Sequence, residues 1–240
     1  MTQGSTDRIL DAINSVILGK HQSVKLALSC LIARGHLLIE DLPGVGKTTL
    51  AHTLATTLGL RFQRVQFTSD MLPADILGVS IYDPEKHQFS FHRGPIFTQL
   101  LLADEINRTP PKTQAALLEA MQERKVTIAG EPFILPAPFL VMATQNPVEQ
   151  SGTFGLPEAQ LDRFMFDIRI GYPKPEEELE IAKTTTADLD VTVNTALSGE
   201  DILNLQQIVR RLPISDHVGR YAVDLARATR PEDETAPGFT

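Results

Sequence analysis

Cysteine, positive charge and long hydrophobic runs are all scarce in this chain. The one cysteine, Cys30, can form neither an internal disulfide nor a zinc site, and its apolar helical surroundings indicate an inert core thiol. The 30 acidic residues outnumber the 22 basic ones, a net charge of -8, which disfavours nucleic-acid binding through phosphate neutralisation. The longest apolar stretches, such as 139–143, are too short to cross a membrane, and the polar residues 1–8 are no secretory signal. We therefore expect a soluble, cytoplasmic protein with no membrane partner.

Helical patterns alternate with short apolar segments along most of the 240 residues, a length that allows one or two domains. Three of the apolar segments are continuous runs, which suits parallel strands buried on both faces. Strands separated by helices predict a doubly wound parallel α/β sheet. The expected helices span 21–34 and 47–58, and the expected strands span 37–39, 61–67, 100–103, 139–143 and 164–170.

Two segments interrupt this alternation and a third ends it. Residues 81–91 and 125–135 each have an extended pattern around a turn, which predicts two β-hairpins inserted into the α/β core. After residue 171 the strand signal stops and only helical patterns follow. We therefore expect an α/β core over residues 1–171 and a small, all-helical lid over residues 172–240.

A glycine-rich turn lies between the strand at 37–39 and the helix that follows it. The turn reads Gly44-Val45-Gly46-Lys47-Thr48, and this strand–turn–helix context is what a phosphate-binding P-loop requires. Backbone N–H groups and the helix N-terminus would hold phosphate oxygens, Lys47 would reach the β/γ-phosphates, and the Thr48 hydroxyl would bind Mg²⁺. Asp41 replaces the first glycine of the full pattern, and its side chain can cap N–H groups of the turn.

The strand at 100–103 ends in two acids, Asp104 and Glu105. In nucleoside triphosphatases the first such acid holds Mg²⁺ together with the P-loop hydroxyl. A second acid beside it can orient or deprotonate the attacking water. Downstream of a P-loop, this pair predicts hydrolysis rather than binding alone.

The strand at 139–143 leads into Thr144-Gln145-Asn146-Pro147. In a parallel sheet the carboxyl end of this strand opens onto the same edge as Lys47 and Asp104. Two interpretations stay open here. The Asn146 amide can position the attacking water, or the Asn-Pro pair can simply form a turn.

Four motifs together resemble the AAA+ ATPases, and the MoxR family within them. They are the segments 40–48, 104–114, 143–147 and 156–164, and the likeness extends from about residue 17 to residue 230. The resemblance implies a P-loop ATPase core that binds ATP with Mg²⁺. It also matches the hairpin at 81–91 to the helix-2 insert and the hairpin at 125–135 to the pre-sensor hairpin, which would both project toward a pore or partner.

The resemblance also implies roles for individual residues. Asn146 matches sensor 1, and Arg163 matches an arginine finger that acts on the nucleotide of a neighbouring subunit, so the active form would be a ring, most simply a hexamer. The alternative for Arg163 is a surface arginine paired with Asp162. The catalytic set is then Lys47, Glu105, Asn146 and Arg163, the metal set is Thr48 and Asp104, and the nucleotide-binding set is Ile17, Leu18, Gly19, Pro43, Gly44, Val45, Gly46, Lys47, Thr48 and Thr49.

MoxR-like proteins act as chaperone-like remodellers that assemble or activate protein complexes, commonly with von Willebrand factor A domain proteins. The resemblance implies the same for this chain and does not name the client. Two other functions remain: a nucleic-acid-stimulated motor, and a nucleotide-gated switch that barely hydrolyses. Family members usually continue into a further lid helix with a sensor 2 arginine, and Arg227 and Arg230 do not match its setting. The chain is thus expected to be truncated, or to work without that contact.

Overall fold

The computed structural model describes residues 21–41, 46–85, 87–146, 152–171, 175–176, 178–179, 183 and 195–230. The chain divides into two compact units, residues 1–206 and 207–240. The domain boundary expected after residue 171 is followed by residues outside the described ranges, and it stays a prediction. No helix in the described part of the chain is both long and apolar enough to cross a membrane.

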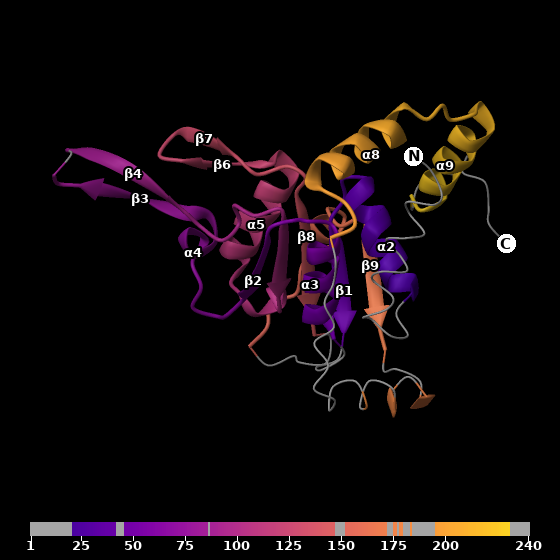
Figure 1. The fold of residues 1–240 in the computed structure, drawn as a ribbon, viewed down its shortest axis with the longest axis horizontal. Coiled ribbons are helices and arrows are strands. Elements are labelled where there is room, and N and C mark those ends of the chain that lie inside the picture. The colour runs from indigo at the N-terminus through magenta and orange to yellow at the C-terminus, as the bar shows by residue number, and fades with distance from the viewer. Residues whose placement is uncertain are drawn as a thin grey trace. The chain divides into compact units, whose positions relative to one another are not determined.

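A five-stranded, fully parallel sheet forms the centre of the larger unit (Figure 1). Two of its three inner strands, β5(Leu100–Asp104) and β8(Leu140–Gln145), are almost entirely buried, as their continuous apolar sequences predict. The order across the sheet is β2(Phe62–Gln66), β5(Leu100–Asp104), β8(Leu140–Gln145), β1(Leu37–Asp41) and β9(Phe166–Ile170).

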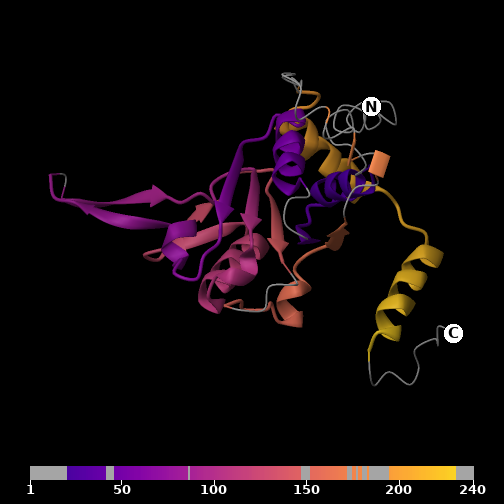
Figure 2. The ribbon, with the colours of Figure 1, turned by 90° about the horizontal axis from the view of Figure 1, so that it is seen from below.

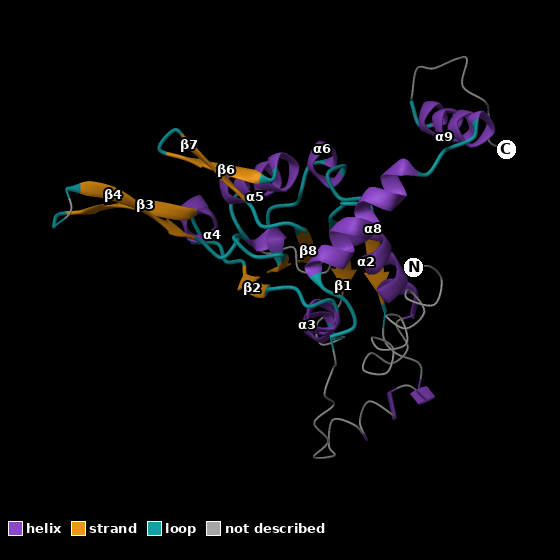
Figure 3. Ribbon diagram, turned by 45° about the horizontal axis from the view of Figure 1, so that its top comes forward, coloured by secondary structure: helices purple, strands orange, loops and turns teal. Residues whose placement is uncertain are grey.

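Helices cover both faces of this sheet, with α3 and α5 on opposite sides (Figure 3). One core packs the sheet against α2(His21–Ile32), α3(Lys47–Thr57) and the first half of α8(Gly199–Arg211). The other core packs it against α4(Pro73–Leu77) and α5(Pro111–Glu123). The predicted doubly wound α/β sheet, with helices after it, is therefore confirmed.

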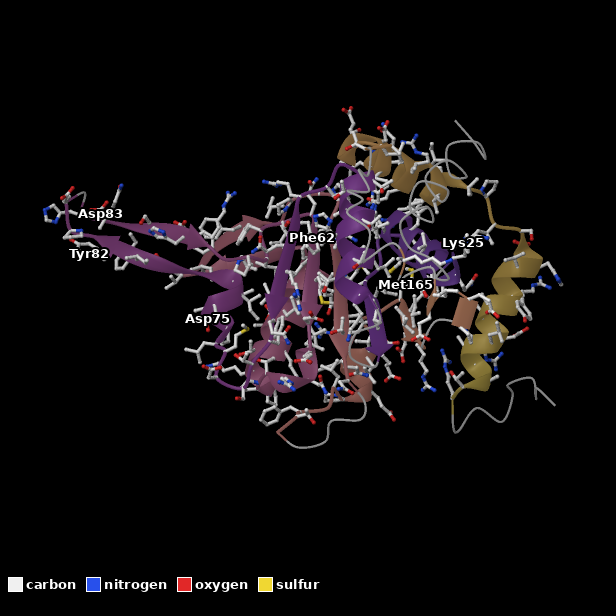
Figure 4. The ribbon with its side chains drawn as sticks, turned by 60° about the horizontal axis from the view of Figure 1, so that its bottom comes forward. Lys25, Phe62, Asp75, Tyr82, Asp83 and Met165 are labelled. Carbon is white, nitrogen blue, oxygen red and sulfur yellow. The ribbon has the colours of Figure 1, made fainter. Side chains whose placement is uncertain are left out.

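Both inserted hairpins are present and extend from the same side of the sheet (Figures 1 and 2). The longer pairs β3(Gly78–Asp83) with β4(Gln88–Arg93), and the shorter pairs β6(Lys125–Ile128) with β7(Glu131–Ile134). Tyr82 and Asp83 lie near the far end of the longer hairpin (Figure 4). Farther in, the Phe91 and Phe133 rings lie 4.2 Å apart between centroids and join the two hairpins.

The smaller unit contains the end of α8 and the helix α9(Asp216–Ala228). The Ser215 side chain caps the α9 N-terminus by accepting a hydrogen bond from the Val218 N–H. No residue of α9 is buried, although the helix carries several large apolar side chains.

Candidate nucleotide-binding and catalytic site

Parallel pairing brings the carboxyl ends of β1, β5 and β8 to one edge of the sheet. Glu40 on β1 pairs with Gln145 on β8, and Ala103 on β5 pairs with Ala143 on β8. The segments after these strands carry the P-loop, the two acids and Asn146. The sheet therefore brings the three predicted motifs to a common edge, which is where α/β proteins of this kind bind ligands.

The helix α3 starts directly after Gly46, whose φ of 87° is left-handed and favours glycine. Within the described residues, no side chain caps this helix end. The first N–H groups of a helix have no partner inside it, so this N-terminus suits an anion such as phosphate. Lys47 and Thr48 are half-buried in the first turn, and Thr49 is exposed. The other predicted nucleotide-binding residues lie outside the described ranges: Ile17, Leu18, Gly19, Pro43, Gly44 and Val45.

Asp104 is held through both of its carboxylate oxygens. Its Oδ1 accepts a hydrogen bond from the Thr144 hydroxyl at 2.8 Å. Its Oδ2 accepts from Arg64 Nε at 2.9 Å and Nη2 at 2.7 Å. The Asp104 side chain is only 7% exposed, so Arg64 supplies a counter-charge for a nearly buried carboxylate.

Glu105 has an unusual backbone conformation, with φ 56° and ψ 50°. This left-handed region costs a non-glycine residue about 1–2 kcal/mol, and such strain concentrates at functional sites. The Glu105 N–H donates to the Thr144 hydroxyl at 2.9 Å. Its Oε2 accepts from Gln66 Nε2 at 2.6 Å and from Arg108 Nε at 3.0 Å. Neighbouring strands thus fix both the backbone and the carboxylate of Glu105.

Asn146 is half-buried directly after β8, and Asn107 Nδ2 donates to its carbonyl oxygen at 3.3 Å. The segment around Asn107 is itself braced by Gln114. The Gln114 amide donates to the carbonyl of Ile106 at 3.1 Å and to that of Phe154 at 2.8 Å. These bonds connect the Asn146 backbone with the turn after the two acids, and the role of the Asn146 side chain stays a prediction.

Glu40 connects the three strands nearest the P-loop. Gln145 Nε2 on β8 donates to its Oε1 at 2.7 Å, and Arg169 Nε on β9 donates to its Oε2 at 3.1 Å. Partial burial, and then the negative charge of Glu40, raise the pKa of nearby Asp167. The sheet edge under the P-loop is therefore tied together by a charged network.

Arg163 lies in an exposed turn after α6(Glu158–Leu161). Among the described residues its side chain forms no ion pair, including with Asp162, which was the alternative to a finger role. The Arg163 N–H donates to the Gln160 carbonyl at 3.3 Å, which helps to hold the turn.

The sequence alone did not identify several residues that hold the two acids. Thr144 lies in one of the sequence motifs, where no role was predicted for it, and Arg64 and Gln66 lie in the predicted strand at 61–67, where no site residue was predicted. Strand order could have found them, because Arg64 and Gln66 lie on β2 beside β5, with Gln66 paired to Asp104. The strand order is known only from the folded structure, because no local sequence pattern specifies it.

The oxygen atoms of Thr48 and Asp104 are of the kind that Mg²⁺ prefers. In the described residues no three or more histidine, cysteine or acidic side chains gather as a metal site. Mg²⁺ is commonly held by one or two protein oxygens together with substrate phosphates. The residues present therefore fit the metal that the motifs imply.

Comparisons with known proteins find consistent matches. The family model "ATPase family associated with various cellular activities (AAA)" matches residues 36–166. The uncharacterised protein YeaC of Bacillus subtilis is 47% identical over 97% of this chain, which spans 73% of YeaC. Chaperone MoxR1 of Mycobacterium tuberculosis is 45% identical over 95% of this chain, which spans 60% of MoxR1. A solved structure from Cytophaga hutchinsonii is 41% identical, with a TM-score of 0.87, over 95% of this chain and 69% of that one.

Proposed function

Because this chain belongs to the AAA+ ATPases, and to the MoxR family within them, we propose that it hydrolyses ATP to remodel protein complexes. The observation that carries the proposal is the arrangement at the sheet edge. Asp104 and Glu105 are fixed by hydrogen bonds to Thr144 on the neighbouring strand. The N-terminus of α3, which no described side chain caps, follows strand β1 of the same sheet.

In the proposed site, backbone N–H groups and charged side chains bind the nucleotide together. The α3 N-terminus and the Lys47 ammonium hold the phosphates through hydrogen bonds and positive charge. Thr48 and Asp104 provide oxygen ligands for Mg²⁺. Mg²⁺ held there would neutralise negative charge that develops on the phosphates during transfer.

Glu105 then acts on the attacking water. Its carboxylate is held by Gln66 and Arg108 at the sheet edge, and from there it orients the water and accepts its proton. Asn146 helps to place the same water against the γ-phosphate. Both roles require the side chains to face the phosphate when ATP is bound.

Arg163 is proposed to act between subunits. An arginine supplied from outside the nucleotide's own chain stabilises the charge on the transferred phosphoryl group, and such fingers raise rates by roughly 10³- to 10⁵-fold. The exposed turn that carries Arg163 supports this role. The active form is accordingly a ring, most simply a hexamer.

The chaperone role is proposed from the relatives. Chaperone MoxR1 supports remodelling of protein complexes as the use of the hydrolysis energy. A von Willebrand factor A domain protein as partner, and a client complex, are proposed from the resemblance to MoxR proteins.

The test is steady-state ATP hydrolysis measured against protein concentration for the native chain, Arg163→Ala and Glu105→Gln. We expect the specific activity of the native chain to rise with concentration, because each site is completed by a neighbour. Arg163→Ala should lose most activity at every concentration while still binding ATP. Glu105→Gln should bind ATP and not turn it over.

The control is Arg211→Ala, another arginine at an exposed position, which should leave the rate unchanged. Specific activity that is independent of concentration and of Arg163 would contradict the shared site. Turnover unchanged in Glu105→Gln would favour the nucleotide-gated switch. Strong, salt-sensitive stimulation by DNA would favour a nucleic-acid motor.

A further inference from the structure

We infer that Thr144 is a positioning residue that aligns Asp104 and Glu105 with each other through its single hydroxyl group. The inference rests on the proposed ATP hydrolysis and adds a residue to which no role had been given. Thr144 is itself a ligand of neither nucleotide nor metal in the proposed site. It acts through the two acids that do.

The Thr144 hydroxyl forms one hydrogen bond with each of the two acids. It donates its hydrogen to Asp104 Oδ1 at 2.8 Å and accepts the Glu105 N–H at 2.9 Å. A hydroxyl has one hydrogen and two lone pairs, so both bonds form at once and have opposite directions. One atom therefore determines where the first carboxylate points and where the backbone of the second acid lies.

The surroundings keep this hydroxyl in one place. Thr144 is 0% exposed, so water does not compete for its bonds. It lies within β8, paired on one side with Ile39 of β1. Its β-branched side chain has few rotamers available, which makes it a stiffer support than a serine.

The backbone of Glu105 explains why such a support is needed. Its φ of 56° and ψ of 50° are unfavourable for a glutamate, and the strained conformation persists only if its surroundings enforce it. The N–H···Oγ1 bond from Glu105 to Thr144 is one such constraint, applied at the strained residue itself. Without it, Gln66 and Arg108 still hold the tip of the Glu105 side chain, but the backbone that directs this side chain loses its hydrogen bond to the neighbouring strand.

The hydroxyl also sets which oxygen of Asp104 remains for a metal. Thr144 occupies Oδ1, and Arg64 donates twice to Oδ2. Because the Thr144 bond is buried and the Arg64 side chain is 48% exposed, the Arg64 contact is the one that can yield to Mg²⁺. Thr144 thus holds the carboxylate in place while its other oxygen exchanges partners.

The experiment compares Thr144→Val, which keeps the shape and removes the hydroxyl, with Thr144→Ser, which keeps the hydroxyl. The matched control is Thr57→Val in α3. Thr57 is equally buried at 0% exposure, and its hydroxyl has no hydrogen-bond partner among the described residues. Thermal unfolding of each variant is recorded first, and Thr144→Ala replaces the valine variant if that one does not fold.

Two readouts are used: kcat and KM for ATP hydrolysis, and a Mg²⁺ titration of the binding of a fluorescent ADP analogue, which needs no turnover. We expect Thr144→Val to lower kcat, and to raise the half-saturating Mg²⁺ concentration, by roughly 10- to 100-fold. The KM for ATP should stay within about threefold, because the phosphate-binding groups are unchanged. Thr144→Ser should recover most of both losses, and Thr57→Val should resemble the native chain.

The inference is overturned if Thr144→Val behaves like Thr57→Val, or if Thr144→Ser is as defective as Thr144→Val. In either case, the proposed function still stands if the native protein hydrolyses ATP. Native protein that neither binds the ADP analogue nor hydrolyses ATP would overturn the proposed function, and this inference with it.

Discussion

At the scale of single residues, His36 is a buried titratable group whose protonation should control stability. Its Nδ1 accepts the Val141 N–H at 3.0 Å, and its Nε2 donates to the Met121 carbonyl at 3.2 Å. A proton on Nδ1 would break the first of these bonds. Burial, and then the nearby positive charge of Arg124, lower the pKa of His36 to about 4.

The sign of the pH effect follows from that lowered pKa. Above the ordinary histidine value near 6.5, neither the folded nor the unfolded state is protonated, and the full stability is present. As the pH falls from 6.5 toward 4, the unfolded state binds a proton that the folded state resists, so the free energy of unfolding drops by about 3 kcal/mol.

The measurement is denaturant unfolding of the native chain and of His36→Gln between pH 7 and pH 4. Glutamine can donate and accept hydrogen bonds but does not titrate in this range, so the other groups cancel in the difference. We expect the native chain to lose about 3 kcal/mol more than the variant over this interval. Parallel pH profiles would show that His36 does not carry the effect.

Single residues also show where prediction of the site from sequence reaches its limit. Lys47, Asp104 and Glu105 were predicted as site residues because each belongs to a short motif with fixed spacing. Arg64 was not found, because its partner Asp104 lies 40 positions away and the contact depends on β2 lying beside β5. Residues proposed to react can be predicted from local sequence patterns. Residues that form hydrogen bonds to them can be predicted only when the strand order is known.

At the scale of elements, the base of the β3–β4 hairpin depends on a close backbone approach at Gly94. A Cβ atom at Gly94 would collide with the Ile76 carbonyl oxygen and the Gly78 nitrogen, both backbone atoms that cannot rotate away. The Gly94 N–H also donates to the Leu77 carbonyl at 3.3 Å. The chain at Gly94 therefore passes so close to the backbone of Ile76 and Gly78 that only glycine fits there.

We expect Gly94→Ala to lower the free energy of unfolding by about 1–3 kcal/mol, the usual effect of overpacking. The matched control is Gly155→Ala, where a Cβ atom would meet no described atom within 4 Å apart from those of its chain neighbours. Chemical denaturation of both variants provides the comparison. Equal stability of the two would mean that the hairpin base can shift to accept a side chain.

The elements were predicted more completely than their connections. The continuous apolar runs at β5 and β8 identified buried parallel strands, and the alternation around residues 81–91 identified a hairpin, because both patterns reflect the periods of local structure. No periodic sequence pattern indicates the contact between Phe91 and Phe133, which joins the two hairpins. Its partners come from strands that are separated by α5.

At the scale of the whole molecule, the buried hydrophobic residues that stabilise the described part of the chain lie in the larger unit. All buried hydrophobic residues of the described ranges lie between Val24 and Ile202. The helix α9 buries none of its residues, while its Val218, Tyr221 and Val223 side chains are each more than half exposed. Neither of the two buried cores of the larger unit, as far as the structure describes them, includes a residue of this helix.

We expect deletion of residues 212–240, which leaves α8 whole, to change the free energy of unfolding by less than about 1 kcal/mol, as surface changes usually do. Binding of the dye ANS, which reports exposed apolar surface, should fall.

A longer deletion of residues 202–240 is the control. It also removes Ile202 and the 2.7 Å hydrogen bond from Gln206 Nε2 to the Leu31 carbonyl, both buried, so it should destabilise the core by about 2 kcal/mol or more. A large loss on the shorter deletion would show that α9 contributes to the fold by contacts outside the described residues.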